Sequence, residues 1–219
     1  MNKHNFKALI FDLDGVIVDS EPLQFEAGQV LFDAYGVKIK IEDRVMDFVG
    51  KTDKEIISAV LKELGREELN VEKLTEERTK IYLELAKEKL LPVKGAIECV
   101  KEYSCNFKKL AITTSSNIEI LDLVLDKFGI RNYFQALISA NDIAYSKPHP
   151  DPYLKTIAKL ECLPEECVVI EDTVVGIASA KAAGAKVIGV TTTYKREKLI
   201  EAGADQVFDN FDEITKYLI

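Results

Sequence analysis

The sequence has no apolar run near the roughly 20 residues that a membrane-spanning helix needs. It also lacks the N-terminal pattern of basic, apolar and small residues that indicates a signal peptide. Its cysteines form no C-x-x-C pair and have no histidine cluster beside them; they are Cys99, Cys105, Cys162 and Cys167. These absences predict a cytoplasmic protein that has reduced, structural thiols and does not bind membranes.

Positive charge is scarce as well. Lysine and arginine number 29 against 37 acidic residues, which gives a formal net charge of −8. This balance argues against a general nucleic-acid or membrane-surface binder. A phosphorylated substrate stays compatible with it, because a metal ion and one lysine can invert the local field. With 219 residues, 47% of them hydrophobic, the chain can form one large domain or a core domain with an insert.

Short apolar runs of strand type alternate with helical patterns over most of the chain. The runs cover 8–11, 110–113, 136–139, 168–170, 187–190 and 206–208. The helical patterns cover 96–103, 119–128, 152–160, 175–183, 195–202 and 211–218. This alternation predicts the α/β class, with a doubly wound parallel sheet and helices on both faces. We assign residues 1–20 and 92–219 to this core domain.

Residues 21–91 break this rhythm, because they contain almost no strand signal. Apolar residues recur there at helical spacing in 23–34, 56–64 and 74–90. The glycines that stop or turn these segments are Gly36, Gly50 and Gly65. The segment is therefore predicted to form a small helical domain inserted after the first strand.

Three of the predicted strands run directly into polar residues. The first continues as Asp12-Leu13-Asp14, the second as Thr114-Ser115-Ser116-Asn117, and a later one as Glu171-Asp172-Thr173. Ligands of open α/β sheets bind at the carboxyl ends of the strands, so we expect these segments to converge on one pocket. The first two carboxylates are two residues apart and point the same way, so they repel unless a cation or separate tasks resolve the conflict.

A lysine lies in a stiff loop between the last two of these strand ends. Lys147 is followed by three prolines at alternate positions, which leave the backbone little freedom. His149, between two of them, is expected to shape the loop rather than act as a base. A positioned lysine offsets the charge that builds up between carboxylates and a phosphate.

Together these groups indicate a phosphate site. Mg²⁺ prefers oxygen ligands and often pairs one or two carboxylates with a substrate phosphate, and Asp12, Asp172 and Glu171 can supply the carboxylates. Phosphoryl transfer needs mainly positioning and electrostatic stabilisation. A carboxylate can also be the nucleophile, and Asp14 could then serve as general acid and base.

Four motifs in order give the chain its resemblance to the haloacid dehalogenase superfamily of hydrolases. They are Asp12-Leu13-Asp14-Gly15, the hydroxyl of Thr114 after an apolar strand, Lys147 before its prolines, and Glu171-Asp172 with Gly176 downstream. The resemblance covers essentially the whole chain. It implies a Rossmann-like core and a cap, formed by the helical insert, that closes over the site and excludes water.

The resemblance also implies a role for each motif residue. Asp12 is the implied nucleophile and a Mg²⁺ ligand, and Asp14 is the acid/base residue whose main-chain carbonyl also binds the metal. Thr114 and Lys147 are implied to hold the phosphoryl group, with Ser115 beside them.

The last motif supplies the remaining metal ligand. Asp172 is the expected direct ligand, whereas Glu171 reaches the metal only if the chain turns there, because neighbours on a strand face opposite ways. Thr114 is expected to cap the helix that starts near residue 117 as well as to bind phosphate.

Within the superfamily, Glu171-Asp172 and Asp19-Ser20-Glu21-Pro22 resemble the group containing β-phosphoglucomutase and small sugar-phosphate phosphatases. Related sequences often carry a histidine where this chain has Gln24, and in the mutase that histidine couples cap closure to proton transfer. The segment 50–55 resembles the substrate-specificity loop of the family. The candidate substrate contacts are Gln24, Gly50, Lys51, Lys54, Arg78 and Asn117.

The leading prediction is a monomeric, Mg²⁺-dependent phosphatase that acts on a small phosphorylated metabolite, a sugar phosphate, through an aspartyl-phosphate. A phosphomutase using the same intermediate is the alternative, and Gln24 argues against it. A non-catalytic phospho-acceptor module is a third hypothesis, but it leaves Asp14 and the helical insert unexplained.

Overall fold

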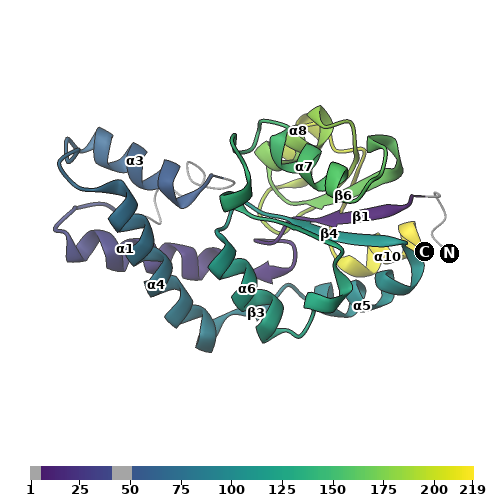
Figure 1. Cartoon of the computed structure of the whole chain (residues 1–219), viewed down its shortest axis with the longest axis horizontal. Coiled ribbons are helices and arrows are strands. Elements are labelled where there is room, and N and C mark those ends of the chain that lie inside the picture. The colour runs from purple at the N-terminus through teal and green to yellow at the C-terminus, as the bar shows by residue number, and fades with distance from the viewer. Residues whose placement is uncertain (1–5, 41–50) are drawn as a thin grey trace.

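The computed structural model describes residues 6–40 and 51–219. Its centre is a parallel sheet in which the described residues supply six strands, in the order β5-β4-β1-β6-β7-β8 (Figure 1). Their bounds are Ala8–Phe11 (β1), Lys109–Thr113 (β4), Ala136–Ile138 (β5), Cys167–Glu171 (β6), Lys186–Val190 (β7) and Gln206–Phe208 (β8). Each predicted strand overlaps one of these, and the predicted α/β class is confirmed.

Helices cover both faces of the sheet because β1 alternates its buried side chains between them. Leu9 and Phe11 pack on the face covered by α5 (Ala96–Asn106), α6 (Ile118–Lys127) and α10 (Phe211–Leu218). Ala8 and Ile10 pack on the other face, with α7 (Asp151–Lys159), α8 (Val174–Ala182) and α9 (Arg196–Glu201). Side chains that alternate in this way on a strand buried on both faces are typical of a doubly wound sheet. Single-turn 3₁₀ helices also occur, at Arg131–Tyr133, Ala140–Asp142 and Pro164–Glu166.

Among the described residues between β2 (Val18–Asp19) and β3 (Leu91–Pro92), three helices form a separate layer beyond the sheet edge at which β1 ends (Figure 1). They are α1 (Glu21–Ala34), α3 (Asp53–Glu63) and α4 (Val71–Lys89), called the helical layer below. Their shared core contains Leu31, Phe32, Ile57, Val60 and Leu74. α3 begins with a capping box, in which the Thr52 side chain and Glu55 bond each other's backbone amides.

Both connections between the helical layer and the sheet pass through one short ribbon. β2 pairs antiparallel with β3, and Asp19 lies opposite Leu91. Sequence patterns did not predict this ribbon. The Lys127 ammonium of α6 also donates to the carbonyls of Ala86 (2.7 Å) and Lys87 (2.8 Å) near the end of α4. The helical layer is thus held at its base. Among the described residues, no helix is both long and apolar enough to cross a membrane.

Candidate active site

The polar strand ends meet because β4, β1 and β6 are neighbours in the sheet. The Asp12 amide donates to the Ile170 carbonyl at 3.0 Å, which carries the β1–β6 pairing one residue past the strand. On the other side, the Thr114 amide donates to the Ile138 carbonyl at 2.9 Å. Asp12, Thr114 and Asp172 therefore stand at one edge of the sheet, as their sequence positions predict.

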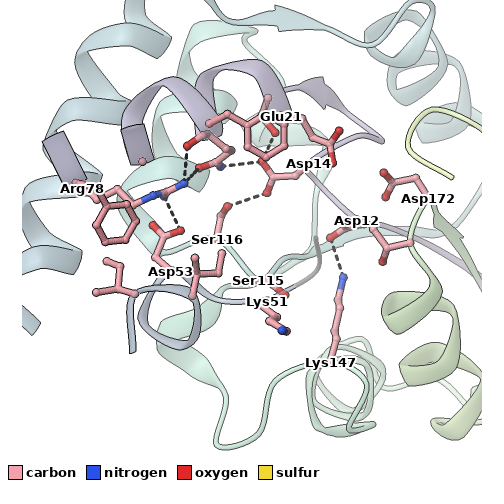
Figure 2. A pocket seen from close by; sticks show the side chains of 18 residues that line it. Asp12, Asp14, Glu21, Lys51, Asp53, Arg78, Ser115, Ser116, Lys147 and Asp172 are labelled. Atoms are coloured by element: carbon pink, nitrogen blue, oxygen red, sulfur yellow. Dashed lines mark hydrogen bonds and ion pairs between the residues drawn. The ribbon is translucent and has the colours of Figure 1, made fainter. Parts of the chain in front are cut away.

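A tight turn after Asp12 sets the position of Asp14. The Leu13 carbonyl accepts hydrogen bonds from the amides of Ile17 (2.8 Å) and Val18 (3.1 Å). Gly15 has a φ of +74°, and a Cβ added there would lie 2.0 Å from Asp172 Oδ2. Both the backbone conformation and the space thus require glycine at this point. The turn brings Asp14 back beside Asp12 but aims its carboxylate at the helical layer (Figure 2).

A buried cluster of opposite charges surrounds Asp12. Lys147 Nζ lies 2.9 Å from Asp12 Oδ1 and 2.6 Å from Glu171 Oε1, and all three side chains are buried. Figure 2 shows Lys147 reaching up to Asp12 from its loop. The Tyr153 hydroxyl donates to the same Glu171 oxygen at 2.8 Å. The lysine predicted to be a positioned cation is therefore fixed from both sides by carboxylates.

The pKa values in this cluster follow from burial and charge. Burial raises the pKa of Asp12 to about 7, with the neighbouring carboxylates adding to the rise and Lys147 opposing it. Burial and the charges of Glu171 and Asp12 hold the pKa of Asp172 well above its ordinary range. Burial works against the charged form of Lys147, but its two carboxylate partners outweigh that effect and raise its pKa well above the ordinary value.

These carboxylates suit a metal ion. Oxygen atoms of Asp12, Glu171 and Asp172 all lie within 4.8 Å of one another. Asp172 Oδ1 is buried and accepts no hydrogen bond in the structure. A buried carboxylate oxygen without a donor is costly unless a cation contacts it. The donor set, which consists of oxygen atoms only, is the kind that Mg²⁺ takes.

Glu171 differs from its neighbours because both of its oxygens are already engaged. Oε1 accepts from Lys147 and Tyr153, and Oε2 accepts from the Asp172 amide (3.0 Å), the Thr173 amide (3.0 Å) and the Thr173 hydroxyl (2.9 Å). The carboxylate therefore anchors Lys147 to the start of α8. This arrangement favours Asp172 over Glu171 as a direct metal ligand.

Asp14 is held in a polar environment. Its Oδ1 accepts a short hydrogen bond from Ser20 Oγ and a longer one from Gln24 Nε2 at 3.4 Å. Its Oδ2 accepts from Ser116 Oγ at 2.7 Å and from Thr114 Oγ1 at 3.3 Å. The two aspartates of the first motif thus occupy different environments, one beside a lysine and the other among neutral donors. This division suits separate chemical tasks.

Gln24 connects Asp14 to the predicted basic residue of the helical layer. Arg78 Nη2 donates to the Gln24 carbonyl (2.9 Å) and to Gln24 Oε1 (2.8 Å), and Arg78 Nη1 lies 2.5 Å from Asp53 Oδ1 (Figure 2). The Nη1–Asp53 contact is a close ion pair without hydrogen-bond alignment. Arg78 is only 5% exposed, so its charge lies inside the helical layer, where Asp53 neutralises it.

A pocket of about 100 Å³ collects most of these groups. Among the predicted site residues, it is lined by Asp12, Asp14, Gln24, Lys51, Arg78, Ser115, Lys147 and Asp172. Thr114 lies behind this lining, fully buried, with its hydroxyl on Asp14.

Other predicted contacts lie elsewhere. Lys54 pairs with Glu72 on the outside of the helical layer at 2.9 Å. Asn117 donates to Thr79 Oγ1 at 2.7 Å, and its own Oδ1 caps α6, so the predicted capping role of Thr114 is wrong. The N-cap of α6 is therefore Asn117, three positions after Thr114. Gly50 lies outside the described residues.

Several residues of the site were not assigned from sequence. Ser20 and Ser116 contribute hydroxyls to Asp14, and Tyr153 contributes one to Glu171. In the loop after β7, the Thr192 hydroxyl donates to the Gly15 carbonyl at 2.6 Å. The first two stand within segments that the motifs already marked, whereas Tyr153 and Thr192 carry no local signal. Their roles depend on contacts between distant segments.

Comparison with known proteins agrees with this geometry. A family model described as haloacid dehalogenase-like hydrolase matches residues 9–190. A phosphorylated carbohydrates phosphatase of Thermotoga maritima is 34% identical over 204 residues, covering 90% of this chain and 92% of that protein. A fructose-1-phosphate phosphatase of Escherichia coli is 30% identical over 185 residues, covering 84% and 96%. The structure of CbbY from Rhodobacter sphaeroides in complex with phosphate superposes with a TM-score of 0.83 at 25% identity, covering 95% and 96%.

Proposed function

Because the chain belongs to the haloacid dehalogenase-like hydrolase family, we propose that it hydrolyses the phosphate ester of a small sugar or polyol phosphate with Mg²⁺ as cofactor. The observation that carries this proposal is the pairing of Asp12 with Lys147 beside Asp14, which is held by neutral donors. The named phosphatases among its relatives act on phosphorylated carbohydrates and fructose 1-phosphate, which supports the substrate class.

Asp12 is the proposed nucleophile. Its carboxylate oxygen attacks phosphorus, the bond from phosphorus to the ester oxygen breaks, and an aspartyl-phosphate forms on Asp12. Lys147 and the Ser115 segment balance the charge on the equatorial oxygens as the phosphoryl group moves. Glu171 acts through Lys147 by holding its ammonium in place.

Asp14 is the proposed general acid and base. It gives its proton to the leaving alcohol oxygen, then takes a proton from the water that attacks the aspartyl-phosphate, which releases inorganic phosphate and restores Asp12. Its hydroxyl donors, Ser20 and Ser116, fix the carboxylate between the sheet edge and the helical layer. The helical layer is then the cap that excludes bulk water from this step.

Asp12, Asp172 and the main-chain carbonyl of Asp14 are the residues that would hold Mg²⁺. When bound there, the ion would neutralise charge on the phosphate oxygens and satisfy the orphaned Asp172 oxygen.

A phosphomutase is the less favoured candidate. A mutase has to bind the phosphate group that the sugar already carries while a hydroxyl of the same sugar accepts the phosphoryl group from Asp12. Gln24 carries no titratable proton, and the Arg78 guanidinium is already occupied by Gln24 and Asp53. Water is therefore the proposed acceptor.

The test measures phosphate release from sugar and polyol phosphates with Mg²⁺ and with EDTA. We expect release that EDTA abolishes and that Asp12→Asn removes, while the surface control Asp212→Asn retains it. With p-nitrophenyl phosphate as substrate, Asp14→Asn should release a single burst of p-nitrophenol and then stop turning over. The burst is expected because that leaving group needs no proton. Isomerisation of a hexose 1-phosphate to the 6-phosphate without phosphate release would establish the mutase instead.

A further inference from the structure

A second depression opens beside the active-site pocket. It is lined by Lys51, Glu55, Ala144, Tyr145, Ser146, Lys147, Pro148 and His149, and it is called the loop groove below. Lys51 and Lys147 line both the pocket and the groove, so the two lie side by side. The groove is a more open depression than the pocket, so a part of the substrate that extends beyond the pocket can lie along it.

Two aromatic rings, those of Tyr145 and His149, line the loop groove. Tyr145 is 62% exposed, although its ring lies against the ring of His149 in a tilted arrangement, with centroids 4.6 Å apart and planes 34° apart. The histidine thus contacts one side of the tyrosine ring, while Tyr145 as a whole stays exposed enough to meet a ligand. An exposed aromatic side chain on the wall of a depression is a common feature of small-molecule sites.

The backbone that carries these rings is fixed. Asp151 Oδ2 accepts from the amides of Ala144 (2.8 Å) and Tyr145 (3.4 Å). The His149 carbonyl accepts from Ser179 Oγ at 2.6 Å, and its Nδ1 accepts from the Asp151 amide at 3.1 Å. A surface held in this way loses little conformational freedom when a ligand binds.

Polar groups border the aromatic rings on the side of the helical layer. Glu55, in the first turn of α3, accepts a short hydrogen bond from the Ser146 hydroxyl, and Lys51 lies at the boundary with the pocket. A carboxylate, a hydroxyl and an ammonium can all bond to hydroxyl groups of a ligand. The groove thus offers one apolar face and a polar edge.

We propose that the loop groove is the subsite for the hydroxylated carbon chain of the substrate and that Tyr145 determines the preference for chain length. This inference rests on the proposed phosphatase function. The C–H groups of a polyol or sugar carry weak positive charge next to their oxygens, and the face of an aromatic ring is negative. The hydroxyl groups on the other side of such a chain would meet Glu55, Ser146 and Lys51.

The length of the substrate's carbon chain determines whether the substrate contacts Tyr145. Tyr145 is two residues from Lys147, so their Cα atoms are at most about 7 Å apart. The Lys147 ammonium lies at the nucleophile, and Lys147 also lines the groove. A three-carbon phosphate ends near the lysine, whereas a six-carbon phosphate extends over the tyrosine ring.

The experiment compares steady-state kinetics of sorbitol 6-phosphate and glycerol 1-phosphate. We expect Tyr145→Ala to raise KM for the six-carbon substrate about tenfold, with kcat within about twofold, since an aromatic contact contributes of this order. KM for glycerol 1-phosphate should stay unchanged. Tyr145→Phe should restore the wild-type KM, and Leu163→Ala, which removes another exposed apolar side chain outside both depressions, should have no effect.

Equal effects of Tyr145→Ala on both substrates, or no effect on either, would overturn the subsite. If the wild type releases phosphate from no sugar or polyol phosphate, the proposed function fails on its own. Calorimetric titration with a non-hydrolysable hexitol phosphonate then tests the groove separately: tenfold weaker binding by Tyr145→Ala than by wild type supports it, and equal binding refutes it.

Discussion

Gly176→Ala is the substitution for which the structure predicts an effect opposite to that of helix propensity. Gly176 lies in α8, where alanine is ordinarily preferred over glycine by about 0.5–1 kcal/mol. A Cβ at this position would lie 1.7 Å from Glu171 Oε1 and 2.0 Å from its Cδ. No contact at that distance is possible, so the carboxylate has to withdraw.

The cost follows from what Glu171 binds. Oε1 accepts from Lys147 at 2.6 Å and from Tyr153 at 2.8 Å, and a displacement of more than 1 Å breaks both bonds. Hydrogen bonds to a buried charge contribute about 1.5–3 kcal/mol each, so we expect a loss of about 3–6 kcal/mol in the free energy of unfolding. That is a large part of the 5–15 kcal/mol or so that holds a typical domain together.

Urea denaturation followed by circular dichroism measures the loss. Gly65→Ala is the matched control, because Gly65 has a φ of +63° with open space around it and should lose only about 1 kcal/mol. Glu171→Asp shortens the displaced side chain, so combining it with Gly176→Ala should recover at least about 1 kcal/mol relative to the sum of the single changes. If Gly176→Ala is as stable as wild type, the contact with Glu171 does not exist and the anchoring of Lys147 needs another explanation.

Two further predictions concern charged groups away from the nucleophile. Arg78→Met leaves Gln24 and Asp53 without their partner inside the helical layer, so we expect the free energy of unfolding to fall by about 3–5 kcal/mol. A loss under about 1 kcal/mol in urea denaturation would contradict the buried ion pair between Arg78 and Asp53. Burial alone would raise the pKa of Asp205, but hydrogen bonds from Lys181 and a β7 amide lower it below its ordinary value. A depressed carboxyl pKa stabilises the fold above about pH 4 and this contribution disappears as pH falls through the folded value, so Asp205→Asn should destabilise at pH 7 and match wild type near pH 2.

The sheet could be predicted because its signals are local. Each strand is a short apolar run between helices, and the predicted and observed bounds of β1 and β8 are identical. The ribbon of β2 and β3 could not be predicted, because two residues are too few to show a period. The predicted monomer and the cytoplasmic location stay predictions.

The site was predictable as far as its motifs reach. Asp12, Lys147 and Asp172 meet because the carboxyl ends of adjacent parallel strands, and the loop beside them, face one edge. Ser20 and Tyr153 could not be assigned, since nothing in their neighbourhoods in sequence specifies which carboxylate they contact. The sequence singled out Gln24 only because related sequences often carry a histidine there, and the structure places it between Asp14 and Arg78.

The ribbon at the base of the helical layer has a consequence for chain entropy. Since Asp19 and Leu91 are paired, the whole segment between them is a closed loop whose ends already meet in the folded sheet. The entropic cost of closing a loop rises by only about 0.6 kcal/mol for each doubling of its length. Evolution can therefore lengthen, shorten or replace that segment at little cost to the folding free energy of the sheet that carries Asp12. Substrate specificity can change in this way.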